Sequence, residues 1–146
     1  MKRILFIVIS ALFVCNIFAN INYIDINKIS KDKKYIDAFD NIKNNQNYYA
    51  IWYYEWNFDI SKEDIVNNLK KEFDNFSSIK SKNIELYLLL GDIAHFLYNL
   101  EVSEYNNIAV ENYNQAIKLN PNEYRAYWFM ATHYSQMGNS VQAMEN

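Results

Sequence analysis

The stretch that most constrains the fold runs from Ala109 to Ala143, where apolar segments of helical length alternate with two stop signals. Pro121 is the first stop, because a proline cannot continue a helix and biases Asn120 before it toward extended backbone. Gly138 is the second, since glycine readily takes the left-handed conformation that ends a helix. The pattern predicts a helix, a short turn, a second helix and the start of a third.

Small and large residues also recur at fixed spacing in this stretch. Ala109 and Ala143 lie 34 residues apart, which is the period of a tetratricopeptide repeat. Small residues let antiparallel helices approach closely, and large ones fill the gaps beside them. The matching positions are Ala109, Tyr113, Ala116, Pro121, Tyr127, Met130, Ala131, Tyr134 and Ala143. The stretch resembles the tetratricopeptide-repeat family, which implies an all-α fold of antiparallel helix pairs stacked as a short α-solenoid that holds another protein.

The resemblance divides the C-terminal part into repeat units 84–121 and 122–146, the second incomplete. Tyr87, Leu90 and Gly91 repeat the spacing of Tyr127, Met130 and Ala131, although 40 residues separate the two sets. We therefore expect an insertion near residues 99–104. A terminal repeat normally carries a polar cap, so we expect either a longer gene product or a partner that covers this end.

The composition and the remaining pattern also favour helices. The chain has two Gly and one Pro in 146 residues, and 51% of it is hydrophobic, which suits one helical domain over 32–146. Residues 20–31 are predicted to be an irregular lead-in. Helices are predicted over 32–43, over the aromatic stretch 48–58, after a capping box at Ser61, over the apolar segment 84–100, and after a cap at Ser103.

The first 19 residues have the form of a signal peptide. Lys2 and Arg3 precede an apolar core, and Ala19 ends a plausible cleavage site. We expect export to the periplasm, the cell envelope or the medium, with Asn20 as the first mature residue. Two alternatives stay open, namely lipidation of Cys15 and retention of the segment as a membrane anchor.

Cleavage after Ala19 would change the charge of the chain. Loss of Lys2 and Arg3 leaves 12 basic residues against 17 acidic ones, a formal net charge of −5. A sequence-independent nucleic-acid binder needs a basic face, so we expect no nucleic-acid partner. We expect membrane contact only through an uncleaved or lipidated N-terminus.

The sequence offers few groups for catalysis. Asp92 and His95 lie three residues apart on a predicted helix, but a metal or acid–base site needs a further ligand or orienting group. His133 has no acid at helical spacing and is expected at a surface or groove. The chain has no Gly-x-Ser-x-Gly elbow and no phosphate-binding loop. We therefore expect no enzyme activity, no metal and no cofactor.

The resemblance implies that the first helix of each pair lines a concave groove that binds protein. Carried onto this chain, the groove residues are Arg125, Trp128, Thr132, Ser135 and Gln136, with Glu85, Leu88, Asp92, His95 and Phe96 from the previous unit. Trp128 beside Arg125 has the composition of an interface anchor; the alternative is that Trp128 is packed in the core.

The expected function is thus an exported, non-catalytic scaffold for protein–protein interaction. Two alternatives remain. Exposed rings of the stretch 48–58 could stack on sugars of the cell envelope, or the helical domain could serve a membrane-anchored assembly factor. Exposure of Trp52 and Trp56 distinguishes the first alternative from core packing.

Overall fold

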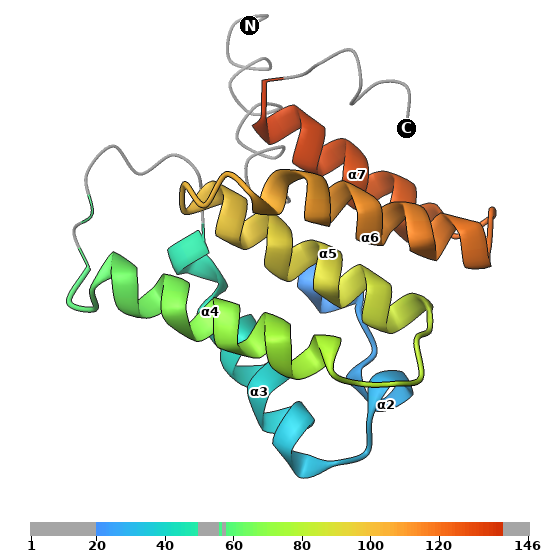
Figure 1. Ribbon diagram of the computed structural model, residues 1–146, viewed down its shortest axis with the longest axis horizontal. Coiled ribbons are helices and arrows are strands. Elements are labelled where there is room, and N and C mark those ends of the chain that lie inside the picture. The colour runs from blue at the N-terminus through green and yellow to red at the C-terminus, as the bar shows by residue number, and fades with distance from the viewer. Residues whose placement is uncertain (1–19, 50–55, 57, 139–146) are drawn as a thin grey trace, which may run out of the picture.

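The computed structural model describes residues 20–49, 56 and 58–138, and all regular structure in these ranges is helical (Figure 1). The elements are the 3-10 helix η1 (Asn20–Tyr23), α2 (Ile26–Ile29), α3 (Lys33–Asn44), the 3-10 helix η2 (Gln46–Tyr49), α4 (Lys62–Ser77), α5 (Ile84–Asn99), α6 (Tyr105–Leu119) and α7 (Tyr124–Gln136). The prediction of an all-α fold is confirmed for these residues. No helix among them is long and apolar enough to cross a membrane.

Helix α5 is the centre of the molecule, as its nearly continuous apolar sequence predicts. It lies between α4 on one side and α6 and α7 on the other (Figure 1). Most of its residues are buried, including the whole run from Leu88 to His95. Asn83 caps its N-terminus, because the side-chain oxygen accepts a hydrogen bond from the amide of Leu86 at 2.9 Å.

Helices α5 and α6 pack closely against each other, and Gly91 on α5 lies against the ring of Tyr113 on α6. A Cβ atom placed on Gly91 would lie 2.4 Å from a ring carbon of Tyr113. Ala109, Tyr113 and Ala116 on α6 are all fully buried. Of the positions expected to pack at a helix crossing, Ala116 and Tyr113 are therefore buried, and Tyr113 packs against Gly91.

Helix α7 packs on α6 after the turn that Pro121 marks. Asn120 has extended backbone, with φ −147° and ψ 102°, and Gly138 has φ 72°; both stop signals act as predicted. The buried residues of α7 are Ala126, Phe129, Met130 and His133. Tyr127, Ala131 and Tyr134, which we expected to be packing positions, are only half-buried, and residues 139–146, predicted to begin the next helix, lie outside the described residues.

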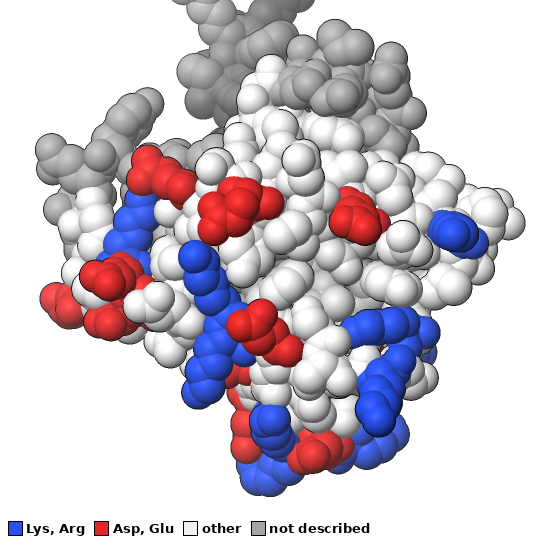
Figure 2. Space-filling view, in the orientation of Figure 1, with Lys and Arg blue, Asp and Glu red and all other residues white. Residues whose placement is uncertain are grey.

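Helices α3 and α4 complete the domain on the far side of α5. Asp32 caps α3 and Ser61 caps α4, where the Ser61 hydroxyl accepts from the amide of Asp64 at 3.0 Å as the capping box predicts. On the face drawn in Figure 2, lysines and carboxylates are interspersed over these two helices. Their charges therefore neutralise one another locally on that face.

Three local predictions need correction. The lead-in 20–31 is structured, with η1 and α2 in it and with Ile21, Ile24 and Ile26 buried. The aromatic stretch 48–58 is not one α-helix, since Tyr48 ends up in the 3-10 helix η2 and residues 56 and 58 lie outside any helix. The cap of α6 is Glu104, without a side-chain cap bond, rather than Ser103. The predicted signal peptide lies outside the described residues.

Candidate protein-binding face

Two of the residues expected to line the groove, Glu85 on α5 and Arg125 on α7, bind each other on one side of these helices, which we name the α5–α7 face. This side is not an open groove, because residues 20–29, named here the N-terminal segment, pack against both helices. Leu88 and Asp92 have no exposed surface and His95 is 3% exposed. The expectation that these three residues line an accessible groove is therefore wrong in this conformation.

Arg125 and Glu85 hold the N-terminal segment by its main chain. The Nη1 atom of Arg125 donates to the carbonyl oxygen of Tyr23 at 2.7 Å, and the amide of Asp25 donates to Oε2 of Glu85 at 2.9 Å. The two side chains also bind each other, since Arg125 Nη2 lies 2.9 Å from Glu85 Oε1. One cation and one anion thus bind a carbonyl and an amide that are two residues apart.

The electrostatics of this pair are set by partial burial and by Glu123. The side chains of Glu85, Glu123 and Arg125 are 5%, 11% and 15% exposed. Arg125 Nε donates to Glu123 Oε1 at 2.7 Å, and this hydrogen bond, followed by those to Glu85, raises the pKa of Arg125. The same hydrogen bond lowers the pKa of Glu123. A guanidinium between two carboxylates is held in place by several charge-assisted hydrogen bonds.

Apolar contacts add to the hold on the N-terminal segment. The ring of Tyr23 lies edge-on to Trp128, with 4.9 Å between the ring centroids. Trp128 also packs on Phe129, and it is half-buried rather than turned out as an open interface anchor. At the other end of the segment, Nδ2 of Asn83 donates to the carbonyl oxygen of Lys28 at 2.8 Å.

A buried polar cluster lies further along the same helices. Nδ1 of His95 and Nδ1 of His133 are 2.8 Å apart, and His133 Nε2 is 2.9 Å from the side-chain oxygen of Asn106. That oxygen is an acceptor, so His133 carries its proton on Nε2 and accepts at Nδ1 from His95. His95 then accepts at Nε2 from Asn99, whose nitrogen is 3.3 Å away.

This arrangement fits two neutral imidazoles. Burial lowers the pKa of His95 to about 3, with a further contribution from His133. Burial also lowers the pKa of His133 to about 4. His133, expected at a surface or groove, has no exposed surface at all. The cluster joins α5, α6 and α7 by hydrogen bonds, and each ring nitrogen already has a partner.

The remaining predicted residues differ in accessibility. Thr132 donates its hydroxyl to the carbonyl oxygen of Trp128, and Gln136 accepts from Asn99 at 2.9 Å. Phe96 stacks beside Tyr49. Ser135 is exposed at the end of α7. The α5–α7 face is therefore accessible mainly near Ser135 and at the N-terminal segment itself.

Asp92 and His95, the pair considered for a metal or acid–base site, have different partners in the structure. Asp92 contacts Tyr113, and His95 contacts His133, so the two do not act as a pair. No group of three or more His, Cys, Asp or Glu side chains in the described ranges is placed to hold a metal ion.

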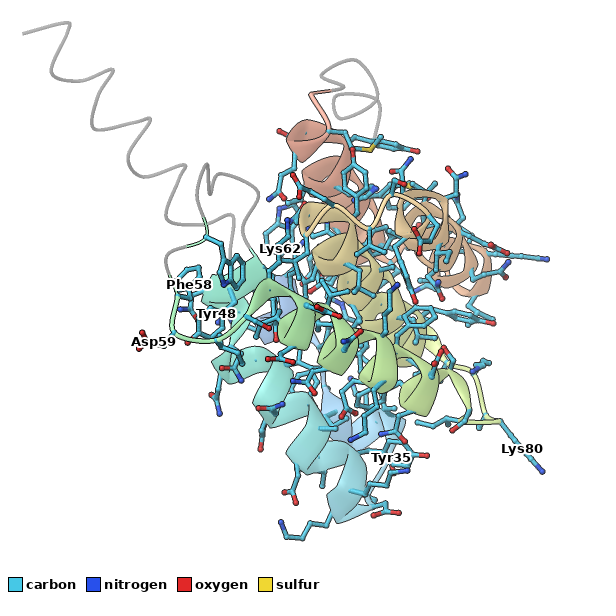
Figure 3. The ribbon with its side chains drawn as sticks, turned by 60° about the vertical axis from the view of Figure 1, so that its left-hand side comes forward. Tyr35, Tyr48, Phe58, Asp59, Lys62 and Lys80 are labelled. Carbon is cyan, nitrogen blue, oxygen red and sulfur yellow. The ribbon has the colours of Figure 1, made fainter. Side chains whose placement is uncertain are left out.

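The aromatic stretch forms a cluster of its own beside η2. Tyr48 and Phe58 lie next to each other in Figure 3, and their ring centroids are 4.7 Å apart. Trp56 packs against both rings and donates its Nε1–H to the carbonyl oxygen of Ile60 at 2.6 Å. The described rings contact one another; Trp52 lies outside the described residues.

Three parts of this face were not predicted from the sequence pattern, namely the N-terminal segment, Glu123 and Asn99. A signal for the segment was present, because Ile21, Ile24 and Ile26 place branched apolar residues every two or three positions. Comparison of the chain with protein-family models, curated proteins and solved structures gave no match. What the fold and the face define is thus a class, an all-helical domain with a chain segment bound across two of its helices.

Proposed function

We propose that this protein is an exported, non-catalytic scaffold that binds another protein at the α5–α7 face. The observation that carries the proposal is the hold of Arg125 and Glu85 on the main chain of the N-terminal segment. Every peptide has the carbonyl and amide that this pair binds, so the same geometry suits a segment of a partner. The resemblance to tetratricopeptide repeats supports a binding role, and the N-terminal sequence pattern supports export.

The composition of the face also suits protein binding. Aromatic residues and arginine are the side chains that most often dominate binding energy at interfaces, and Tyr23, Trp128 and Arg125 lie together here. Tyr23 is 50% exposed. A partner can therefore first contact Tyr23 at the edge of this aromatic pair, before a segment of the partner replaces the N-terminal segment on Arg125 and Glu85.

Site-specific crosslinking tests the proposal. A photoreactive amino acid is placed at Ser135, which is exposed next to the face, and in a matched control at Glu63, which is exposed on α4. After export in the native envelope, we expect a discrete protein adduct from position 135 and none from position 63. Identical adducts from both positions would contradict binding at this face, and adducts with wall polymer alone would favour the carbohydrate alternative.

A further inference from the structure

Asp92 is a buried carboxylate that has no positively charged partner among the described residues. It has no exposed surface. Its Oδ1 atom accepts from the hydroxyl of Tyr113 at 3.4 Å, and no hydrogen-bond partner for its Oδ2 atom lies in the part of the chain that the structure describes. An ionised carboxylate in such a place is costly unless a cation compensates it. Consistently, burial raises the pKa of Asp92 to about 7.

The group that faces Asp92 from the N-terminal segment is Asn20. Asn20 is 4% exposed at the start of η1, which packs against α5, and hydrogen bonding by its side chain lowers the pKa of Asp92. Its Oδ1 atom has no hydrogen-bond partner among the described residues. The backbone nitrogen of Asn20 is only four covalent bonds from its side-chain nitrogen. A charge on that backbone nitrogen would therefore belong to the residue whose side chain already faces the Asp92 carboxylate.

Asn20 is also the residue that follows the expected cleavage site. Hydrolysis by a signal peptidase breaks the peptide bond between Ala19 and Asn20 and consumes one water molecule. The hydroxyl of water goes to the carbonyl carbon of Ala19, and a hydrogen goes to the nitrogen of Asn20. The amine then takes one more proton, from solvent or from the carboxyl group of Asp92, and becomes an ammonium.

We propose that this new α-ammonium group of Asn20 forms a buried ion pair with Asp92, so that removal of the signal peptide completes the folded domain. The inference rests on the export part of the proposed function. Breaking a buried pair by removing one partner is strongly destabilising. The unprocessed chain, in which the Asn20 nitrogen is an uncharged amide, is accordingly the less stable form.

The test uses the full chain, exported and processed by a bacterial host. Mass spectrometry first establishes the N-terminus of the purified protein. The matched control has one glycine inserted between Ala19 and Asn20, so that the same cleavage leaves the ammonium one residue further from Asp92. We expect the insertion to lower the thermal midpoint by about 4 °C or more. In the Asp92→Asn background the same insertion should change the midpoint by less than half as much.

The outcomes separate the two ideas. A mature terminus elsewhere than Asn20 refutes cleavage at this bond, and with it the pair. Confirmed cleavage at Asn20 with equal midpoints for the two chains overturns the pair and leaves export intact. If Asp92→Asn does not fold, the pH dependence of the wild-type difference decides. An ammonium deprotonates above about pH 8. The difference in thermal midpoint between the chain that begins at Asn20 and the chain with the inserted glycine should therefore shrink as the pH rises through the amine's pKa. A difference that is constant up to pH 10 contradicts the pair.

Discussion

Gly91 shows how one residue fixes the spacing of two helices. A glycine inside a helix normally costs about 1 kcal/mol relative to alanine, because of the backbone freedom lost on folding. At Gly91 the missing Cβ leaves room for the ring of Tyr113, which would otherwise lie at 2.4 Å. At this position the close packing of α5 against α6 outweighs the low helix propensity of glycine.

The Gly91→Ala variant tests this balance, because the two effects have opposite signs. We expect a loss of roughly 1–3 kcal/mol in the free energy of unfolding from overpacking, measured by urea denaturation. In a Tyr113→Leu background, Gly91→Ala should lower the free energy of unfolding by less, because the smaller leucine side chain leaves space for the added methyl group. A gain of stability from Gly91→Ala alone would show that α5 and α6 are further apart than described.

His95 and His133 make stability depend on pH. The unfolded chain binds protons at both imidazoles below about pH 6.5, whereas burial holds the folded pKa values at about 3 and about 4. The unfolded state therefore binds more protons between pH 6.5 and 4, and the free energy of unfolding falls as the pH is lowered through that window. In the chain before removal of the signal peptide, Asp92, whose folded pKa is raised, contributes a slope of opposite sign.

A substitution isolates the contribution of one imidazole. Each histidine contributes about 1.4 kcal/mol per pH unit to this slope. We expect His133→Gln to reduce the slope of the free energy of unfolding against pH by about that amount between pH 5 and 6.5. The free energies are measured by urea titrations at several pH values. The wild-type chain measured in parallel is the reference. An unchanged slope would mean that His133 titrates normally and is not held neutral in the cluster.

At the scale of elements, the helices follow from local sequence signals and their contacts do not. The stops at Asn120 and Gly138 and the cap at Ser61 were predictable, because each depends on the backbone preferences of one or a few residues. The burial of His133 was not predictable, because its partners Asn106 and His95 come from two other helices. Likewise, apolar residues in the aromatic stretch 48–58 recur with the period of a strand and also with that of a helix. The structure places Tyr48 and Tyr49 in the 3-10 helix η2 and residues 56 and 58 outside any helix.

The caps of α4 and α5 can be compared directly, because Ser61 bonds only to its own helix whereas Asn83 also bonds to the N-terminal segment. The hydroxyl of Ser61 binds one amide of its own helix, so Ser61→Ala should cost about 1 kcal/mol. The side chain of Asn83 caps α5 and also donates to the carbonyl oxygen of Lys28. We expect Asn83→Ala to cost more than Ser61→Ala by about 1 kcal/mol, in the same denaturation assay. Equal losses would show that the bond to Lys28 contributes nothing to the hold on the N-terminal segment.

At the scale of the whole molecule, the central feature is a chain segment bound across α5 and α7. The sequence indicated that Glu85 and Arg125 belong to one face, because each follows helical spacing, and the two side chains bind each other. It did not indicate that residues 20–29 cover this face, because that contact joins positions about 60 to 100 residues apart, as in the bonds of Asp25 to Glu85 and of Tyr23 to Arg125. The stacking of repeats and the partner remain proposals.

Amide hydrogen exchange tests most directly whether Arg125 and Glu85 hold this segment. We compare the wild-type chain with Arg125→Ala and with Lys118→Ala, a control at an exposed position of α6. We predict that residues 23–28 are protected in the wild type and in the control. In Arg125→Ala they should exchange about tenfold faster or more, while α5 and α6 remain protected. Exchange of residues 23–28 at the rate of an unfolded peptide in the wild type, or unchanged protection in Arg125→Ala, would contradict the account.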